Sequence, residues 1–371
     1  MSREFIPISK PWVGEEEIEE VKKHILSRNL TNSSVYGGEA VREYERLISS
    51  FLGVKHIVAV NSGTSALLAS LMALEISAGD EVIVPSFTFL STVNVVLMLG
   101  AKPVFADITL DNYGLDPTDV KRKITEKTKA IILAHLYGYP AYIKEIKEIA
   151  ERNNLYLIED AAQALGSRVD GKYVGGFGVV GCFSTYPTKI ITTGEGGFIA
   201  TGSDELAWKL RVIRTHGQDK PYQSSVLGLN LRLPEVLAAI GMVQMRKLNK
   251  ILLLRREIAK QYCKELSDLD LIVPRENKHV RFNWNCYTIR IVKWSRDEVL
   301  RKLNEKKIGA TVYYKQPVHL SPLYKKLSCN IKLPKTEEAS KTVLSLPIYP
   351  EMTGKQVKYV VESLKQVLNL I

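Results

Sequence analysis

The fold class is decided by the stretch Leu155-Tyr156-Leu157-Ile158-Glu159-Asp160-Ala161-Ala162-Gln163 of this 371-residue chain. An apolar strand here ends in two acids. Parallel α/β sheets place their ligands at the carboxyl edge of the strands, where these acids stand. An acid at that edge can bind a ribose, a metal ion or a protonated ring nitrogen. The alternative is that Asp160 caps a helix.

Around this stretch, residues 49–201 alternate short apolar runs with helical patterns, which is typical of an α/β domain with a mostly parallel sheet. The predicted strands are 56–60, 81–84, 103–107, 130–134, 156–159, 181–184 and 198–201. The predicted helices are 65–74, 89–99, 143–153 and 204–215.

A long helical pattern over 234–262 leads into a second region that reads as α+β. There we expect a strand near 287–292 and helices near 296–306 and 354–368. The sequence thus predicts a large cofactor-binding domain over 1–245, including an amino-terminal arm, and a smaller carboxyl-terminal domain over 246–371.

The composition is that of a soluble globular protein, with 45% hydrophobic and 25% charged residues. No apolar run approaches the ~18 residues that cross a bilayer, and acids stand where a secretory signal has its apolar stretch. The four cysteines show no CxxC pair and no metal-ligand spacing: Cys182, Cys263, Cys286 and Cys329. We therefore expect a cytoplasmic protein with reduced thiols, no metal and no membrane partner.

The positive charge is concentrated in the second region. The net charge is +11, and residues 246–371 hold 26 Lys and Arg against 12 Asp and Glu. Such a region attracts nucleic acid or an anionic small molecule, or simply presents solvated helix faces. No basic run is interleaved with stacking aromatic residues, so we expect no nucleic acid partner.

A candidate anion site lies at Asn61-Ser62-Gly63-Thr64-Ser65-Ala66-Leu67, between a predicted strand and a predicted helix. Free backbone N–H groups at a helix start bind anions, and Gly63 lets the backbone approach a phosphate closely. Thr64 and Ser65 add hydroxyl donors. The alternative is an ordinary helix cap by Ser62 or Thr64.

A candidate reactive lysine, Lys189, lies in a loop rich in Gly and Thr that ends in Gly194-Glu195-Gly196-Gly197. A partly desolvated lysine loses its proton more easily and can form a Schiff base with a carbonyl. A surface lysine is the alternative, which the neighbouring glycines disfavour. Residues 176–181 match GxGxxG, but they lead into a β-like run and open no helix, so we reject a dinucleotide site.

A phosphate cradle, an acid at a strand end and a lysine 29 positions after that acid are together what pyridoxal 5'-phosphate requires. The lysine holds the aldehyde, the acid keeps the pyridine nitrogen protonated, and the helix start neutralises the phosphate. The sequence therefore predicts pyridoxal 5'-phosphate as the cofactor.

The chain resembles the DegT/StrS-type sugar aminotransferases, which have the pyridoxal phosphate fold type I. The resemblance runs through nearly the whole chain, and its order and spacing are specific. The matching segments are Gly37-Gly38-Glu39, Tyr44-Glu45, Asn61 to Leu67, Pro85 to Phe89, Glu159 to Ala164, Lys189, Thr193 to Gly197, Arg214 to Gly217, Gly228 to Arg232 and Pro317 to His319.

The resemblance implies roles for ten residues. Lys189 would bind the cofactor covalently and shuttle a proton, Asp160 would bind the pyridine nitrogen, and Gln163 would lie near the ring. Phe89 would stack on the ring, with a core Phe as the alternative. The remaining implied contacts are Thr64, Ser65 and Ser184 to the phosphate, Asn230 to the phosphate of a neighbouring subunit, and Tyr314 and His319 near the sugar. A homodimer with shared sites follows, and a satisfied loop histidine is the alternative for His319.

The family contains transaminases with Lys at the reactive position and a sugar dehydratase branch with His there. Lys189 therefore implies amino transfer from glutamate to a nucleotide-linked keto-sugar, with the keto group at C3 or C4, for amino-sugar and surface polysaccharide biosynthesis. The basic second domain would help to hold the diphosphate. A regulatory DNA-binding protein is a further alternative, although no helix-turn-helix pattern is present.

Overall fold

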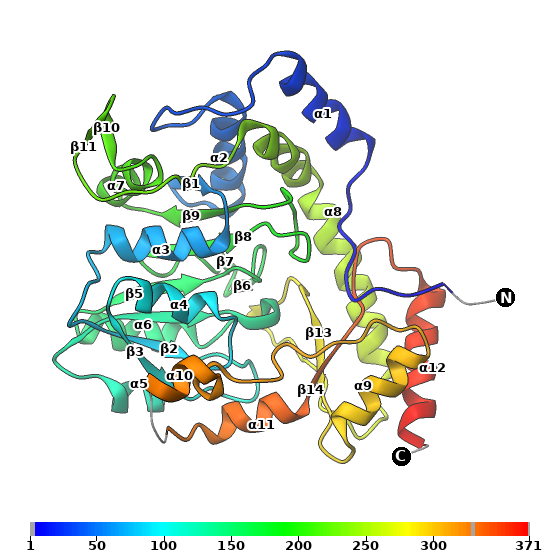
Figure 1. Cartoon of the computed structure of the whole chain (residues 1–371). Coiled ribbons are helices and arrows are strands. Elements are labelled where there is room, and N and C mark those ends of the chain that lie inside the picture. Colours follow the sequence, from blue (N-terminus) through cyan, green and yellow to red (C-terminus); the bar gives the residue numbers. More distant parts are fainter. Residues whose placement is uncertain (1–3, 328–330, 370–371) are drawn as a thin grey trace.

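The computed structural model describes residues 4–327 and 331–369 (Figure 1). In this part of the chain the largest sheet has seven strands in the order β1-β9-β8-β5-β4-β2-β3. Its strands are β1 (His56–Val60), β2 (Glu81–Pro85), β3 (Lys102–Ala106), β4 (Thr128–Ala134), β5 (Tyr156–Asp160), β8 (Val180–Ser184) and β9 (Gly197–Thr201).

Parallel pairing joins β3, β2, β4, β5 and β8, whereas β9 runs antiparallel to both of its neighbours. The predicted mostly parallel mixed sheet is therefore confirmed. Because β5 lies between β4 and β8, Asp160 is in register with Ala134 on one side and Cys182 on the other. The carboxyl ends of three strands thus meet at one place.

Both faces of the sheet are covered by helices because alternate strand residues enter opposite hydrophobic clusters. In β4, Ile131 and Leu133 face one cluster with α2, α6 and α8, whereas Ile132 faces the other with α3, α4 and α7. The helices beside the sheet are α2 (Glu39–Leu52), α3 (Gly63–Ala73), α4 (Ser91–Met98), α5 (Pro117–Lys123), α6 (Ile143–Arg152) and α7 (Asp204–Arg214).

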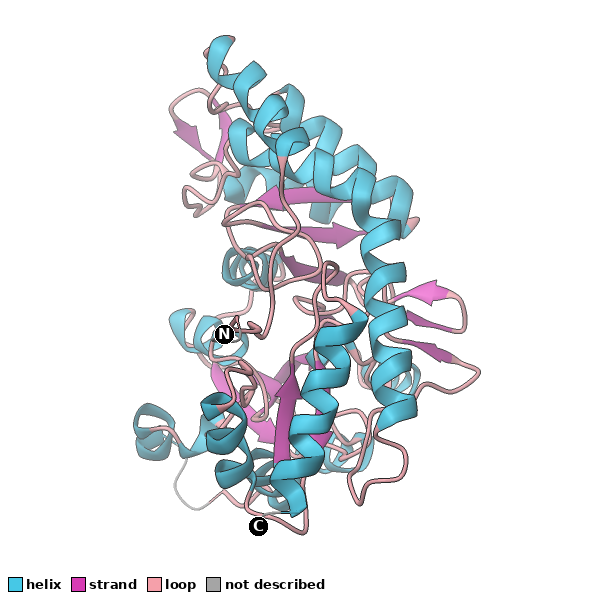
Figure 2. Ribbon diagram, turned by 90° about the vertical axis from the view of Figure 1, so that its right-hand side faces the viewer, coloured by secondary structure: helices cyan, strands magenta, loops and turns pink. Residues whose placement is uncertain are grey.

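Helix α8 (Glu235–Glu265) runs from the large sheet into the second region (Figures 1 and 2). Its first half packs beside the sheet through Ala238, Met242 and Met245. Its second half joins the other core through Ile258 and Tyr262. The predicted boundary after residue 245 falls inside this continuous helix and stays a prediction.

The second region has the expected α+β character. Strands β13 (Tyr287–Arg290) and β14 (Val343–Leu346) pair antiparallel beneath helices α9 (Arg296–Glu305) and α12 (Gly354–Asn369). The remaining elements are α1 (Glu15–Leu26), α10 (Pro322–Leu327), α11 (Pro334–Thr342), the short strands β6 (Arg168–Val169), β7 (Lys172–Tyr173), β10 (Gln218–Lys220), β11 (Gln223–Ser224) and β12 (Val280–Arg281), and two 3-10 turns at 136–138 and 318–320.

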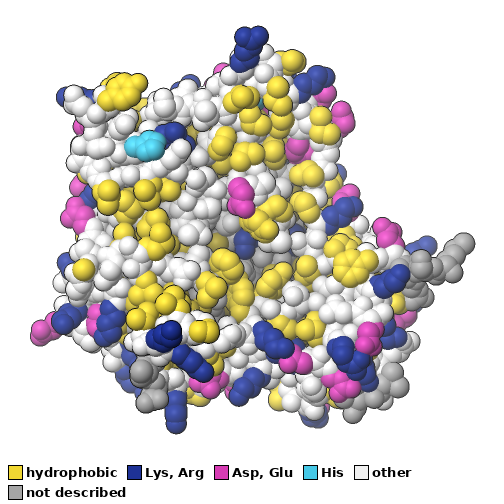
Figure 3. Space-filling model, viewed as in Figure 1, with side chains coloured by type: hydrophobic (Ala, Val, Ile, Leu, Met, Phe, Trp, Pro, Cys, Tyr) yellow, Lys and Arg dark blue, Asp and Glu magenta, His cyan; other side chains and the backbone are white. Residues whose placement is uncertain are grey.

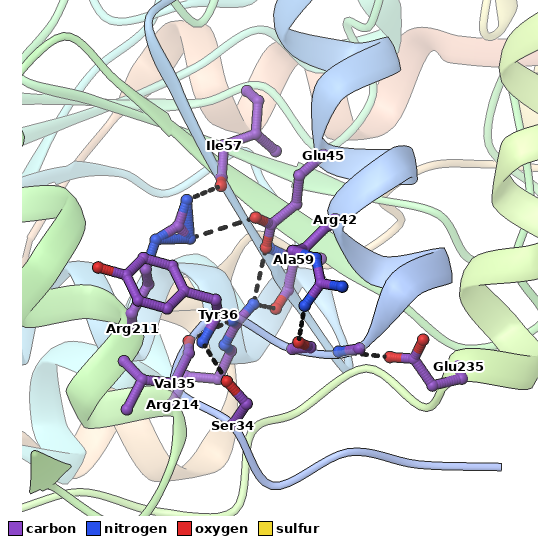
Figure 4. Close-up of polar contacts among 12 residues, drawn as sticks. Ser34, Val35, Tyr36, Arg42, Glu45, Ile57, Ala59, Arg211, Arg214 and Glu235 are labelled. Atoms are coloured by element: carbon purple, nitrogen blue, oxygen red, sulfur yellow. Dashed lines mark hydrogen bonds and ion pairs between the residues drawn. The ribbon is translucent and has the colours of Figure 1, made fainter. Parts of the chain in front are cut away.

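Buried charges tie the elements on one side of the sheet together (Figure 4). The Glu45 carboxylate of α2 accepts hydrogen bonds from Arg214 Nη1 at 2.8 Å and Arg211 Nη1 at 3.2 Å, and both arginines belong to α7. It also accepts the backbone N–H of Ala59 in β1 at 2.9 Å. The Tyr44-Glu45 motif therefore fixes β1, the strand that leads into the candidate anion site.

The Gly37-Gly38 motif has a packing reason. Glu235 accepts the backbone N–H groups of Gly38 and Ala40 at 2.9 Å each (Figure 4 labels Glu235). A Cβ atom on Gly38 would lie only 2.4 Å from Glu235 Cδ, so a side chain there would displace the Glu235 carboxylate. The acid at the start of α8 is thereby fastened to the start of α2.

In the described ranges, none of the helices is both long and apolar enough to cross a membrane. Cys182, Cys263 and Cys286 are free thiols, as expected, whereas Cys329 lies outside the described residues.

Candidate active site

A cavity of about 520 Å³ opens where the ends of β4, β5 and β8 meet the start of α3. It brings together eight of the residues singled out in the sequence: Gly63, Thr64, Phe89, Asp160, Gln163, Ser184, Lys189 and Tyr314. Residues separated by up to 251 positions in the chain thus share one cavity.

The start of α3 forms the anion-binding part of the cavity. Ser62 caps the helix by accepting the Ser65 N–H at 3.0 Å, so the cap alternative describes Ser62 correctly. A Cβ on Gly63 would lie 2.8 Å from Ser184 Cβ, which explains the glycine at this close approach of α3 and β8. The first N–H groups of a helix have no acceptor within it, so they remain available to an anion.

Asp160 lies at the end of β5 and is 8% exposed. Its carboxylate accepts Thr92 Oγ1 at 2.7 Å and the Ala162 N–H at 3.2 Å. No helix begins at Asp160, so the helix-cap alternative is wrong. Burial raises the pKa of Asp160, and a positively charged group placed beside it would oppose that rise.

Lys189 lies in the loop between β8 and β9, and this loop is closed at its base. Thr185 N–H donates to Gly196 O at 2.9 Å, and the Thr185 and Thr193 hydroxyls are 2.7 Å apart. Burial lowers the pKa of Lys189, while Asp160 works in the opposite direction. Lys189 is therefore a partly desolvated amine at a fixed place, and the surface-lysine alternative is wrong.

Gln163 and two aromatic residues form another wall. Gln163 Oε1 accepts the Tyr137 N–H at 2.7 Å, and its Nε2 donates to Tyr314 Oη at 3.2 Å. Phe89 is 53% exposed and its ring centre lies 6.0 Å from that of Tyr314. The alternative of Phe89 as a core residue is therefore wrong.

Three predicted residues do not line this cavity. The Ser65 hydroxyl donates to Asn61 Oδ1 at 2.6 Å. Asn230 is exposed, and its carbonyl accepts Asn61 Nδ2 at 3.3 Å.

His319 is the third. It is 2% exposed and its Nδ1 is 2.6 Å from Ser86 Oγ, which also accepts the His319 N–H at 3.0 Å. Its Nε2 faces Glu337 Oε1 at 3.7 Å. The alternative of a satisfied loop histidine therefore holds for Nδ1 only, because Nε2 is buried without a hydrogen-bond partner among the described residues.

Glu159 does not face the cavity. Its fully buried carboxylate accepts the N–H groups of Gly175, Phe177 and Gly178 at 2.6–2.7 Å and His135 Nε2 at 3.0 Å. Burial acts to raise the pKa of Glu159, but the hydrogen bonds from His135 and the backbone outweigh it, so the pKa is lowered. The GxGxxG segment therefore wraps an acid and leads into β8, which confirms the rejection of a dinucleotide site.

Sequence reasoning missed His135, Thr188 and Tyr313 among the lining residues, and it gave no role to Thr88 and Glu195, although both lie in segments that it singled out. His135 directly follows β4, and that position at a strand end is the signal that identifies it. From residues 246–371, those in the described part that line the cavity are Tyr313 and Tyr314, neither of them cationic. The expected basic contribution of the second domain to this cavity is thus not found in the chain itself.

The donor set fits pyridoxal 5'-phosphate. The glycine-lined helix start suits a phosphate, the buried Asp160 suits a protonated ring nitrogen, and Lys189 is a desolvated amine. No group of three or more His, Cys, Asp or Glu side chains in the described residues is arranged to hold a metal ion.

The proteins that this chain is similar to include curated relatives and solved structures named as aminotransferases. A Geobacillus stearothermophilus "pleiotropic regulatory protein" is 40% identical, over 95% of this chain and 96% of its own. The UDP-N-acetyl-3-dehydro-alpha-D-glucosamine 3-aminotransferase of Acidithiobacillus ferrooxidans is 37% identical, over 93% of each chain. A solved structure of PseC from Helicobacter pylori, an aminotransferase involved in the biosynthesis of pseudoaminic acid, has a TM-score of 0.93 and 27% identity, over 99% of this chain and 100% of its own.

The similarity in fold covers the whole cavity, because the superposed structure spans both the large sheet and the second region. The family model of the DegT/DnrJ/EryC1/StrS aminotransferases matches residues 13–365. With the sequence match and the fold in agreement, this chain belongs to the DegT/DnrJ/EryC1/StrS aminotransferase family.

Proposed function

We propose that this protein is a pyridoxal-phosphate-dependent aminotransferase that moves an amino group from glutamate to the 3- or 4-keto group of a nucleotide-linked sugar. The observation that carries the proposal is the convergence of Lys189, Asp160 and the start of α3 on one cavity. Each of the three lies on a different element, and each suits a different part of the cofactor.

Three groups of this chain would hold the cofactor: Lys189 its aldehyde, Asp160 its ring nitrogen, and the backbone and hydroxyl groups of Gly63, Thr64 and Ser184 its phosphate. When bound, the cofactor supplies an electron sink for the carbon that loses or gains the amino group. Gln163 and Phe89 would bound the space for the ring. Ser65 would support the cradle through Asn61.

The chain's own residues account for the proton movements. The pKa of Lys189 is lowered by burial, so near neutral pH a larger fraction of its amine is uncharged and free to act as a base than in a surface lysine. The same Nζ can return that proton in the second half of the reaction. Lysine at this position favours amino transfer over the dehydration that histidine-bearing members carry out.

A nucleotide-linked keto-sugar is the acceptor that the comparisons support, since one relative is named for an amino transfer to such a sugar. Another relative is named as a regulator. DNA binding does not require a buried acid such as Asp160 and a desolvated lysine such as Lys189 in one cavity, whereas the proposed enzyme requires both. We therefore favour the enzyme. Surface polysaccharide and amino-sugar biosynthesis would consume the product.

We further propose a homodimer with shared sites. Of the described residues lining the cavity, Lys189 alone is a Lys or Arg, whereas the substrates carry carboxylates or a diphosphate. Hydrophobic side chains gather on the face above α3 and α4 (Figure 3). They include the exposed Phe89, Leu90 and Met98. The exposed segment with Asn230 would then reach a partner's phosphate. Light scattering on the active protein should give twice the mass of 41.7 kDa, and full activity from a monomer would refute the dimer.

The function is tested by following both halves of the reaction separately. With the cofactor loaded, glutamate alone should yield 2-oxoglutarate in an amount equal to the enzyme. A nucleotide-linked keto-sugar added afterwards should be aminated and should restore the initial absorption spectrum. Alanine and aspartate, tested in place of glutamate, control for donor choice. A loaded enzyme that releases no keto acid from any of the three donors would overturn the proposal.

A further inference from the structure

A second, smaller cavity of about 40 Å³ lies behind Lys189. It shares Gln163, Thr188, Lys189, Tyr313 and Tyr314 with the larger cavity. Its other walls come from distant segments, namely Ile8 and Ser9, Asn285 and Cys286, and Leu346 and Ile348. The volume is sufficient for a water molecule, and several of the lining groups are polar.

Asn285 brings an unpaired acceptor to this cavity. The residue is 5% exposed, and its Oδ1 is buried without a hydrogen-bond partner in the described structure. Its backbone N–H donates to Asn283 Oδ1 at 2.9 Å, and its Nδ2 lies 3.5 Å from Cys286 Sγ. Burying a carbonyl oxygen without a hydrogen-bond donor costs free energy of folding, so such an oxygen normally accepts a hydrogen bond from the protein or from water.

The segment that carries Asn285 is held firmly. Asn283 Nδ2 donates to Gln163 O at 2.8 Å and to Leu165 O at 3.0 Å. Cys286 N–H donates to Tyr137 O at 3.2 Å. The backbone on both sides of Asn285 is therefore held in place, and this positions the side chain at the small cavity.

Lys189 brings the matching donor. Within residues 4–327 and 331–369, its amino group makes no hydrogen bond and no ion pair, although it lines the same small cavity. Gln163 does not bond to Asn285 in the described structure: its Oε1 accepts from Tyr137 and its Nε2 donates to Tyr314, while Asn285 Oδ1 has no partner. An unpaired donor and an unpaired acceptor thus face one space.

We propose that Asn285 is a positioning residue whose Oδ1 accepts a hydrogen bond from the Lys189 amino group, directly or through one water molecule, whenever that group is not bound covalently. The inference rests on the proposed role of Lys189. Between the two halves of the reaction the amine must stay near the reacting carbon, and a fixed acceptor holds it there.

The hydrogen bond has a measurable consequence. A carbonyl oxygen accepts more strongly from an ammonium than from an amine, so Asn285 favours the charged form of Lys189. This opposes the burial that lowers the Lys189 pKa. Asn285 thereby sets the pH at which the amine changes from proton donor to proton acceptor.

Titratable and charged groups also surround Lys189. They are His135, Asp160, Tyr186 and Glu195 in the large cavity, Cys286, Tyr313 and Tyr314 in the small one, and Lys10 and Arg255 in a third space on the amino-terminal side. Burial raises the pKa of the Cys286 thiol to about 11, so this group is uncharged at neutral pH. Because Asn285 carries no charge, an apolar replacement removes the hydrogen bond and leaves all charges unchanged.

The test measures the pKa of Lys189 in the full chain without cofactor, by competitive acetylation with acetic anhydride at a series of pH values and mass spectrometry of the lysine peptides. Asn285→Leu keeps the branching and the number of side-chain heavy atoms and should lower the Lys189 pKa by about one unit. Asn285→Asp should raise it. The pKa values of the surface lysines, measured in the same digests, should be the same in all variants.

An unchanged Lys189 pKa in folded Asn285→Leu would overturn the proposal. If that variant does not fold, Asn285→Ala gives the same comparison with a smaller side chain. The measurement needs no amino donor, so a shift in Lys189 titration with no keto acid from any donor would refute the proposed function and leave this inference standing. An active aminotransferase whose Lys189 pKa is the same with and without Asn285 would refute this inference and leave the proposed function standing.

Discussion

Lys189→Ala is expected to abolish amino transfer, with the rate of 2-oxoglutarate release from glutamate falling by at least about 10³-fold. The variant loses both the covalent attachment of the cofactor and the group that moves the proton. No other lysine or arginine in the described part of the chain lines the cavity and could replace it. Rapid mixing of the loaded enzyme with glutamate, followed by keto acid assay, measures the loss.

Two controls separate chemistry from structure in this prediction. Lys189→Arg keeps a positive charge in the cavity but offers no amine that loses its proton near neutral pH, so it should be as inactive as Lys189→Ala. Lys172→Ala, on an exposed short strand, should retain full activity. A loss smaller than tenfold in Lys189→Ala would show that the lysine is not the reacting group.

The fold was predictable because its signals are local. The run Ala130 to Ala134 is apolar at every position, which is typical of a strand buried on both faces. The helices began and ended within a few residues of the expected positions, as in α6 (Ile143–Arg152). The domain boundary was harder to place, because α8 contributes its two halves to two cores without an interruption.

The cofactor residues were predictable for a related reason. Asp160, Lys189 and Gly63 each stand in a short motif at the end of a strand or the start of a helix, so the sheet topology alone brings them together. Thr92 lies 68 positions before Asp160 and donates to it at 2.7 Å, and no local pattern marks that contact. Asn285 is similar, because its relation to Lys189 depends on how the second region packs against the first.

The two adjacent acids of β5 show the limit of sequence reasoning most clearly. Glu159 and Asp160 both end an apolar strand, and successive strand residues point to opposite sides of a sheet. The sequence does not indicate which side holds the cavity. The structure directs Glu159 to three backbone N–H groups and His135, and Asp160 to the cavity. Replacing the carboxylate by an amide should therefore have different effects on stability and activity at the two positions.

Asp160→Asn is expected to lower the rate of the glutamate half-reaction by about 10²- to 10³-fold, because a neutral amide cannot stabilise a protonated ring nitrogen in a buried site. The stability of the cofactor-free chain should not fall. The folded pKa of Asp160 is raised by burial, so its charged form costs free energy in the folded state at neutral pH. The uncharged Asn removes that cost, and urea unfolding at pH 7 should show an equal or higher free energy of unfolding.

Glu159→Gln is the matched control, because it makes the same change of one oxygen to an NH₂ group at the neighbouring position. The folded pKa of Glu159 is lowered, so its carboxylate stabilises the folded chain at pH values above the unfolded pKa of about 4.3. This stabilisation is lost as the pH falls through the folded pKa. The amide in Glu159→Gln would leave buried N–H donors unsatisfied, so the free energy of unfolding at pH 7 should fall by about 3–5 kcal/mol. At acid pH the variant and the natural chain should differ less in this free energy. If Asp160→Asn unfolds as easily as Glu159→Gln, Asp160 is a structural acid and its assignment to the cofactor is wrong. We expect Asp160→Asn to lose activity but keep its stability, and Glu159→Gln to lose stability at pH 7. This pair of results would place Asp160 in the reaction.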